Sequence, residues 1–200
     1  MLRAVVFDIG GALLSYAEGV DVDGAWERRL GLAPGDLARL VWNTPIQQAA
    51  ERGELAFERF WRDASAALGI DDAAAAELYE DCWRLAVLEP EVERWVRSLR
   101  PRYRLATLSN GWSDARRQCS ERYGIEHLLD VMVFSAEEGI AKPDAEIYRR
   151  TLARLDVHAH EALFLDDRVE NVNTARAVGM QAIHVTSAAQ MIAEGTAALA

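Results

Sequence analysis

Several side chains that could bind a metal ion or an anion follow apolar segments of the chain, each at the point where a strand would end. They are, in chain order, Asp8, Ser109 with Asn110, Lys142, and Asp166 with Asp167. Aspartate, serine and asparagine are also common in turns and helix caps, so any one of them alone has an ordinary structural explanation. Two separate carboxylate positions, a hydroxyl and an amine on one sheet edge instead indicate a site with a metal-binding and an anion-binding half.

The chemistry of such a site follows from charge. Asp166 and Asp167, brought near Asp8, would repel it unless a cation lay among them, and hard oxygen ligands of this kind suit Mg²⁺. Ser109 and backbone N–H groups at the start of the following helix would contact an anion, and the helix dipole would strengthen these contacts. Lys142 would balance charge on a transferring group and hold Asp8 ionised.

Lys142 is the only lysine among 22 lysine and arginine residues. An ammonium group is more compact and more strongly hydrated than a guanidinium group, so the two are not interchangeable at a site. The solitary lysine is therefore either functional or an accident of an arginine-rich composition.

The elements that would position these residues are an alternating series of strands and helices. Residues 2–9 form a continuous apolar run, which is typical of a strand buried on both faces of a parallel sheet. After Pro101 the pattern predicts strands at 103–109, 131–135, 162–166 and 181–186, with helices at 113–124, 145–155 and 170–180 between them. The expected fold class is α/β, a doubly wound, Rossmann-like parallel sheet whose ligand site lies beyond the carboxyl ends of the strands.

The stretch from residue 21 to residue 100 reads differently, because apolar residues recur there at helical spacing and no convincing strand occurs. We expect a small all-helical cap domain at residues 15–89, inserted after the first strand into a core domain made of residues 1–14 and 90–200. Glu51, Arg52 and Glu54 either face the site from this cap or form a solvated junction between helices.

Composition limits the surroundings and partners. The formal net charge is −10, which opposes binding to nucleic acid or to an anionic membrane. No apolar stretch approaches the roughly 20 residues that a membrane span requires, and no signal peptide is recognised. Cys82 and Cys119 form no disulfide pattern, so we expect a cytoplasmic location. The sequence indicates no particular oligomeric state.

Four segments, FDIGGALL, LSNG, AKPDAEIY and FLDDRVENVNTARAVGM, resemble in order and placement the four motifs of the haloacid dehalogenase-like (HAD) hydrolase superfamily. The resemblance covers roughly residues 1–14 and 90–186. Within the superfamily, the chain looks closest to the branch that contains α-D-glucose-1-phosphate phosphatase and the N-terminal phosphatase domain of soluble epoxide hydrolase. It implies a Mg²⁺-dependent phosphatase that acts on small phosphorylated metabolites, sugar phosphates among them.

Carried over to this chain, the resemblance makes Asp8 the nucleophile that forms an aspartyl-phosphate. The resemblance also implies that Mg²⁺ is bound by Asp8, the Gly10 carbonyl and Asp167, with Asp166 and Asn171 acting through water or behind these ligands. It implies that Ser109 and the Asn110 amide hold the phosphate, and that Lys142 stabilises the charge that develops on it.

The chain departs from this pattern at Gly10, where most phosphatases of the superfamily have an aspartate that protonates the leaving oxygen. General acid–base help is typically worth about 10² to 10⁴ in rate. We therefore expect a preference for good leaving groups, such as anomeric sugar phosphates, acyl phosphates or aryl phosphates, and no phosphomutase activity.

Two alternatives remain. A 2-haloacid dehalogenase needs no leaving-group acid, but those enzymes resemble this chain less at the Asp166–Asp167 doublet and use no metal. A binding or regulatory protein that kept the fold and lost turnover is supported only by Gly10.

Overall fold

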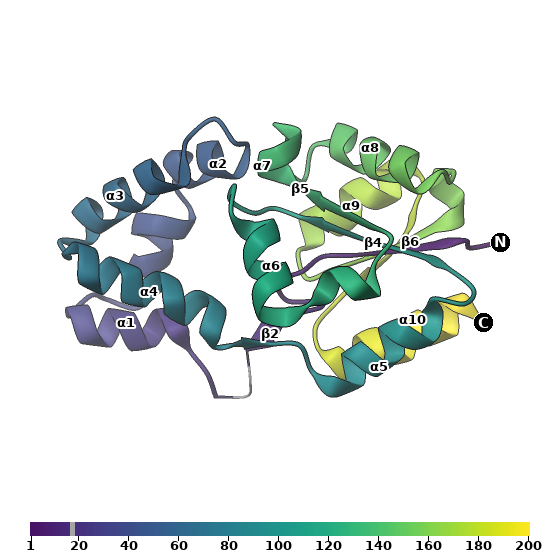
Figure 1. Ribbon diagram of the computed structural model, residues 1–200, viewed down its shortest axis with the longest axis horizontal. Coiled ribbons are helices and arrows are strands. Elements are labelled where there is room, and N and C mark those ends of the chain that lie inside the picture. Colours follow the sequence, from purple (N-terminus) through teal and green to yellow (C-terminus); the bar gives the residue numbers. More distant parts are fainter. Residues whose placement is uncertain (17–18) are drawn as a thin grey trace.

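The computed structural model describes residues 1–16 and 19–200, which form a parallel sheet flanked by helices and a separate group of helices beyond one end of it (Figure 1). The strands of this five-stranded sheet are, in spatial order, β5 (Val131–Phe134), β4 (Arg104–Ser109), β1 (Ala4–Phe7), β6 (Ala162–Asp166) and β7 (Gln181–His184). β1 lies in the centre, pairs in parallel with both β4 and β6, and is buried along its whole length. Burial on both faces explains its continuous apolar sequence. The predicted α/β fold is confirmed.

Helices cover both faces of the sheet. They are α5 (Pro90–Leu99), α6 (Ala115–Tyr123), α7 (Ser135–Glu138), α8 (Ala145–Leu155), α9 (Val169–Val178) and α10 (Ala188–Leu199), with 3-10 turns at Ile125–Leu128 and Ala159–Glu161. Alternate residues of β1 point to opposite faces, as the pleat of a strand requires. Val5 and Phe7 pack in one hydrophobic cluster with α5, α6 and α10, whereas Ala4 and Val6 pack in another with α8 and α9.

The segment between β1 and α5 is mainly helical, as predicted. It contains α1 (Val22–Leu30), the π-helical segment η1 (Ala38–Trp42), α2 (Pro45–Glu51), α3 (Phe57–Leu68) and α4 (Asp72–Arg84). Asp21, Thr44 and Asp71 begin three of these helices by accepting an N–H from the first turn, which satisfies donors that have no partner within the helix. The helices share a hydrophobic core of their own, which includes Phe60 and Leu78.

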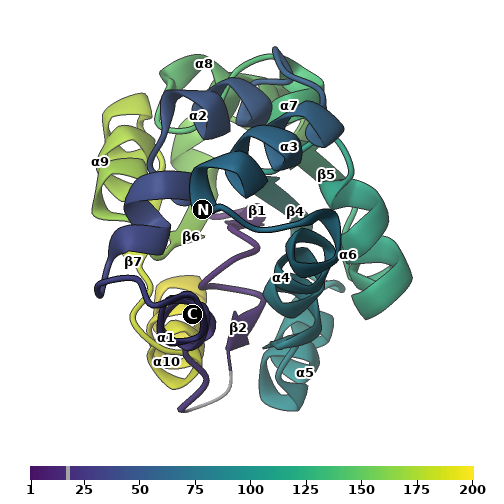
Figure 2. The ribbon, with the colours of Figure 1, turned by 90° about the vertical axis from the view of Figure 1, so that its left-hand side faces the viewer.

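The helical group lies beyond the carboxyl ends of the strands (Figures 1 and 2). It is joined to the rest of the chain through β2 (Ser15–Tyr16) and β3 (Ala86–Val87), which pair with each other in antiparallel fashion. The expectation of no strand in residues 21–100 is therefore wrong at β3, because a two-residue strand is too short to show a sequence period. The division into a core of 1–14 and 90–200 and a cap of 15–89 stays a prediction.

The alanine-rich segment after Ser187 forms α10. The Ser187 hydroxyl accepts the N–H of Gln190 and so begins the helix, whose Met191 and Leu199 are buried. Cys82 and Cys119 are both free thiols. No helix in residues 1–16 or 19–200 is long and apolar enough to cross a membrane.

Candidate active site

Asp8 follows the last residue of β1, and its backbone N–H extends the sheet by donating to the Leu165 carbonyl at 2.8 Å. Its side chain is buried. Two donors reach the carboxylate Oδ1: the Ile9 N–H at 2.7 Å and the Lys142 ammonium Nζ at 2.9 Å. Both contacts from the described residues fall on Oδ1, so Oδ2 is the oxygen left for another role.

Lys142 is held from both ends. The side-chain amide of Asn110 donates to the Lys142 carbonyl at 2.9 Å and accepts the Lys142 N–H at 2.8 Å, which fixes the backbone. The Lys142 ammonium then lies between Asp8 and Asp166, at 2.9 and 2.6 Å, with a side chain only 1% exposed. Burial alone would lower the pKa of Lys142, but the two carboxylates outweigh it and raise this pKa.

Asp166, the last residue of β6, is fully buried, and both its carboxylate oxygens have partners. Oδ1 accepts the Arg168 N–H at 2.8 Å and the Asn171 side-chain amide at 2.9 Å, while Oδ2 accepts the Lys142 ammonium. With its oxygens occupied in this way, Asp166 positions Lys142 and is poorly placed to be a direct metal ligand. Asn171 contacts Asp166 and lies one step further from Asp8.

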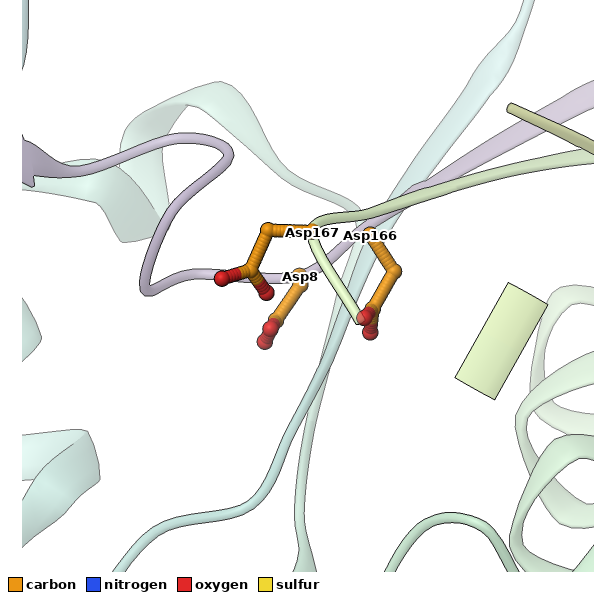
Figure 3. A group of neighbouring side chains, drawn as sticks. All are labelled: Asp8, Asp166 and Asp167. Atoms are coloured by element: carbon orange, nitrogen blue, oxygen red, sulfur yellow. The ribbon is translucent and has the colours of Figure 1, made fainter. Parts of the chain in front are cut away.

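The carboxylates of Asp8, Asp166 and Asp167 form a cluster in which one oxygen of each lies within 4.8 Å of the other two (Figure 3). Burial raises the pKa of Asp8 to about 6, and the neighbouring charges of Asp166 and Asp167 add to this effect, whereas Lys142 opposes it. The pKa of Asp167 is raised as well, mainly by burial and by Asp166. Asp8 and Asp167, backed by the charge of Asp166, supply hard oxygen donors that fit a small divalent cation such as Mg²⁺.

Gly11 allows Asp167 to lie close to the chain that leaves β1. Its φ is +77°, in the left-handed region, and a Cβ built on it would be 2.5 Å from the Asp167 Cγ. Only glycine fits such an approach without displacement of the carboxylate. Gly10 is different, because a Cβ built there has no atom within 4 Å and its φ lies outside the left-handed region. The backbone therefore offers no reason for a glycine at position 10.

Ser109 and Asn110 end β4 on the same edge of the sheet, and both line the cavity next to the carboxylates. The Asn110 side chain is committed to the Lys142 backbone, so its own backbone N–H is the group left for an anion. The following helix, α6, begins only at Ala115. Ser109 is thus the last residue of β4 and Asn110 lies in the loop that precedes the helix, so neither is at the helix N-terminus, which corrects the expected contribution of the helix dipole at Ser109.

The structure separates Glu51 from Arg52 and Glu54, the three residues of the helical insert whose roles the sequence left open. Glu51, at the end of α2, lines both cavities of the site, and burial raises its pKa. Arg52 and Glu54 instead pair with each other at 2.8 Å on the surface. Trp112 lines the larger cavity and packs against Trp42 with ring centroids 6.0 Å apart, so it contributes to packing and to the cavity wall. Helical periodicity alone could not orient these side chains, because it gives no position of the insert relative to the sheet.

A family model described as a haloacid dehalogenase-like hydrolase matches residues 2–179. Among curated proteins, the chain is 26% identical over 185 residues to a sesquiterpene phosphatase of Aspergillus oryzae, with 92% of this chain and 90% of the relative covered. It is 31% identical over 157 residues to a phosphoserine phosphatase of Thermus thermophilus, with 76% and 59% covered. A D-ribitol-5-phosphate phosphatase of Bacteroides thetaiotaomicron is 26% identical over 192 residues, with 90% of each chain covered.

Solved structures share the fold. A HAD-like hydrolase of Porphyromonas gingivalis superposes with a TM-score of 0.78 at 23% identity, covering 100% of this chain and 98% of that one. A HAD-family enzyme of Bacteroides thetaiotaomicron in complex with magnesium and inorganic phosphate has a TM-score of 0.76 at 16% identity, with 94% and 96% covered. An L-2-haloacid dehalogenase of Xanthobacter autotrophicus has a TM-score of 0.67 at 23% identity, with 98% and 84% covered.

Proposed function

Since the chain belongs to the haloacid dehalogenase-like hydrolases, we propose that it is a Mg²⁺-dependent phosphatase in which Asp8 is the nucleophile. The observation that carries this proposal is the Asp8 carboxylate, which is paired through Oδ1 with a buried lysine and lies among carboxylates suited to a divalent cation. Curated relatives named for a sesquiterpene, phosphoserine and ribitol-5-phosphate phosphatase support phosphate ester hydrolysis. A cytoplasmic location is part of the same proposal.

In this proposal, Asp8, Asp167 and the Gly10 carbonyl would hold Mg²⁺, with Asp166 behind them. The ion would neutralise charge on the phosphate that would otherwise repel Asp8. Ser109 and the Asn110 backbone N–H would bind phosphate oxygens. Lys142 keeps Asp8 ionised and balances the negative charge that grows on the transferring group.

The reaction has two displacements. The Asp8 Oδ2 attacks phosphorus, a bond forms between them, and the phosphorus–oxygen bond to the organic group breaks, so that this oxygen leaves with the bonding pair. Water then attacks the phosphorus of the aspartyl-phosphate and gives up a proton to the solvent, the bond to Oδ2 breaks with its electron pair returning to the Asp8 carboxylate, and inorganic phosphate departs. In the described structure the leaving oxygen has no acid at position 10, so its proton comes from water, and good leaving groups such as anomeric sugar or aryl phosphates are favoured.

The proposal is tested by the hydrolysis of phenyl phosphate with and without Mg²⁺. Wild-type protein should release phosphate only with Mg²⁺ and, after rapid quenching, should carry one phosphoryl group on the peptide that contains Asp8. Asp8→Asn should lose turnover and labelling. Asp72→Asn, at an exposed position in α4, is the matched control and should retain both. Full turnover in Asp8→Asn would refute the mechanism.

A 2-haloacid dehalogenase is the second candidate, and Gly10 is the observation that favours it, because displacement of a halide needs no acid. The structural likeness to the Xanthobacter enzyme shows the fold alone. Release of chloride from 2-chloropropionate without Mg²⁺, together with no release of phosphate from any phosphate ester, would replace the phosphatase by the dehalogenase.

A further inference from the structure

The site opens into a cavity of about 1170 Å³ that lies between the sheet edge and the helical insert. One end of this cavity consists of Gly10, Ser109, Asn110 and Asp167, which belong to the candidate active site. A group that fills the cavity would therefore be continuous with a phosphate bound at Asp8. The cavity is somewhat larger than the roughly 300 to 1,000 Å³ that is usual for sites of drug-sized molecules.

The walls away from this end are largely apolar and come from both the core and the insert. The large side chains among them are Leu14, Tyr16, Trp42, Trp83, Trp112 and Phe134. Tyr16 is part of β2 and Trp83 lies in α4, shortly before β3, while Trp42 and Trp112 pack against each other. Flat aromatic walls give large contact areas to apolar ligands and few hydrogen bonds to hydroxyl groups.

Charge in this cavity is one-sided. Among the described residues that line it there is no lysine, arginine or histidine, whereas Glu51, Glu89 and Asp167 are present. Glu89 accepts a hydrogen bond from the Ser15 hydroxyl at 2.8 Å. The cationic side chains Arg52, Lys142 and Arg168 line a second, smaller cavity of about 500 Å³. A leaving group with its own carboxylate or second phosphate would therefore lack a partner in the larger cavity.

The absence of a side chain at Gly10 also enlarges this cavity at the place where the organic group must meet the phosphate. Gly10 is exposed there, and the space around its Cα is open. Gly10, which provides no acid for the leaving oxygen, thus also leaves room for a large organic group next to the reacting phosphorus.

We propose that the substrate of this site is a phosphate monoester whose organic group is bulky, uncharged and apolar. This rests on the proposed function and makes it narrower, because it disfavours sugar phosphates. A sugar has many hydroxyl groups, and although Gln47, Glu51 and Glu89 could bind some of them, those that face the tryptophan and leucine side chains would lose their hydrogen bonds to water without replacement. An apolar group gains from the same contacts.

The test is a series of 4-alkylphenyl phosphates, from phenyl to 4-butylphenyl, in the presence of Mg²⁺. A para-alkyl group hardly changes the phenol as a leaving group, so the series varies apolar size alone. kcat/KM should rise about fourfold per methylene, which corresponds to about 0.8 kcal/mol. 4-Carboxyphenyl phosphate should be a worse substrate than phenyl phosphate. Equal kcat/KM along the series, or a better rate with the carboxylate, would overturn the proposal.

Variants locate the effect in the cavity. Trp83→Ala should flatten the dependence on chain length, while Trp83→Phe should keep most of it. The Trp83 Nε1 has no hydrogen-bond partner among the described residues, so its removal breaks no such bond. Ile46→Ala, an exposed apolar residue of α2 outside the cavity lining, is the control and should keep the full slope. An unchanged slope in folded Trp83→Ala would overturn the assignment to this cavity.

A binding measurement separates this inference from the phosphatase proposal. Binding of 4-butylphenol, which carries no phosphate, should change the tryptophan fluorescence of wild-type protein and do so more weakly in Trp83→Ala. Binding without any phosphate release from the ester series would contradict the proposed function and leave the apolar site standing. Phosphate release that does not depend on alkyl chain length, together with no binding of 4-butylphenol, would contradict the apolar site and leave the proposed function standing.

Discussion

Replacement of Gly10 by aspartate should restore the proton donor that the leaving oxygen lacks. The backbone permits the change, because the φ of Gly10 lies outside the left-handed region and a Cβ there meets no atom within 4 Å. The position is exposed, so the new side chain displaces no buried group and the free energy of unfolding should change by no more than about 0.5 kcal/mol.

The gain in rate should depend on the leaving group. For an alkyl phosphate, whose oxygen needs a proton as it departs, kcat/KM should rise by about 10² to 10⁴, or roughly 3 to 5 kcal/mol of barrier. For 4-nitrophenyl phosphate the gain should be about tenfold or less, because that phenolate is stable without a proton. A plot of log kcat/KM against leaving-group pKa should therefore be flatter in Gly10→Asp than in the wild type.

The assay is phosphate release under Mg²⁺ saturation, with Gly10→Asn as the control, since asparagine has the same shape and no acid. Gly10→Asn should keep the steep wild-type slope. Equal gains for alkyl and nitrophenyl esters in Gly10→Asp would refute the reasoning, as would a folded, Mg²⁺-binding Gly10→Asp with no gain for either.

Lys142→Arg should lower kcat/KM by about 10² although the charge is kept, because a guanidinium cannot enter the 2.6 and 2.9 Å contacts of one compact ammonium; unchanged turnover would mean that the solitary lysine is an accident of composition. Mg²⁺ at 100 times its dissociation constant should stabilise the fold by about 2.7 kcal/mol in urea titrations, and Asp167→Asn should lose most of this gain. Gly11→Ala should cost about 1 to 3 kcal/mol of stability and weaken Mg²⁺ binding measured by calorimetry, whereas Gly35→Ala, at a similar φ with no neighbouring atom within 4 Å, should cost stability and leave Mg²⁺ binding intact.

The alternating core is the part of the fold that local sequence determines best. The β1 strand is buried on both faces and pairs on both edges, so its apolar run has a single physical explanation. The two-residue strands β2 and β3 carry no period and arise from pairing across some 70 residues of sequence, which no local pattern reveals.

The candidate site residues could be predicted from their positions at strand ends, but their partners could not. Asn110 holds the Lys142 backbone because two loops lie next to each other at the edge of the sheet. Both oxygens of Asp166 are occupied because of the position of Asn171 in α9. These are tertiary distances, which residue types and spacing do not specify. The cavity walls, with Trp83 and Trp112 from different parts of the chain, could not be predicted for the same reason.

The β2–β3 pair has a consequence for how such a molecule can change. Ser15 lies opposite Val87 and Tyr16 opposite Ala86, so the chain leaves the sheet and returns to it at neighbouring points. The entropy of closing a loop rises only with the logarithm of its length, so the sheet tolerates segments of very different size between these points. At the β2–β3 pair, one inserted segment and the cavity walls that it supplies can therefore be replaced by another, while the carboxylates and the lysine stay in place.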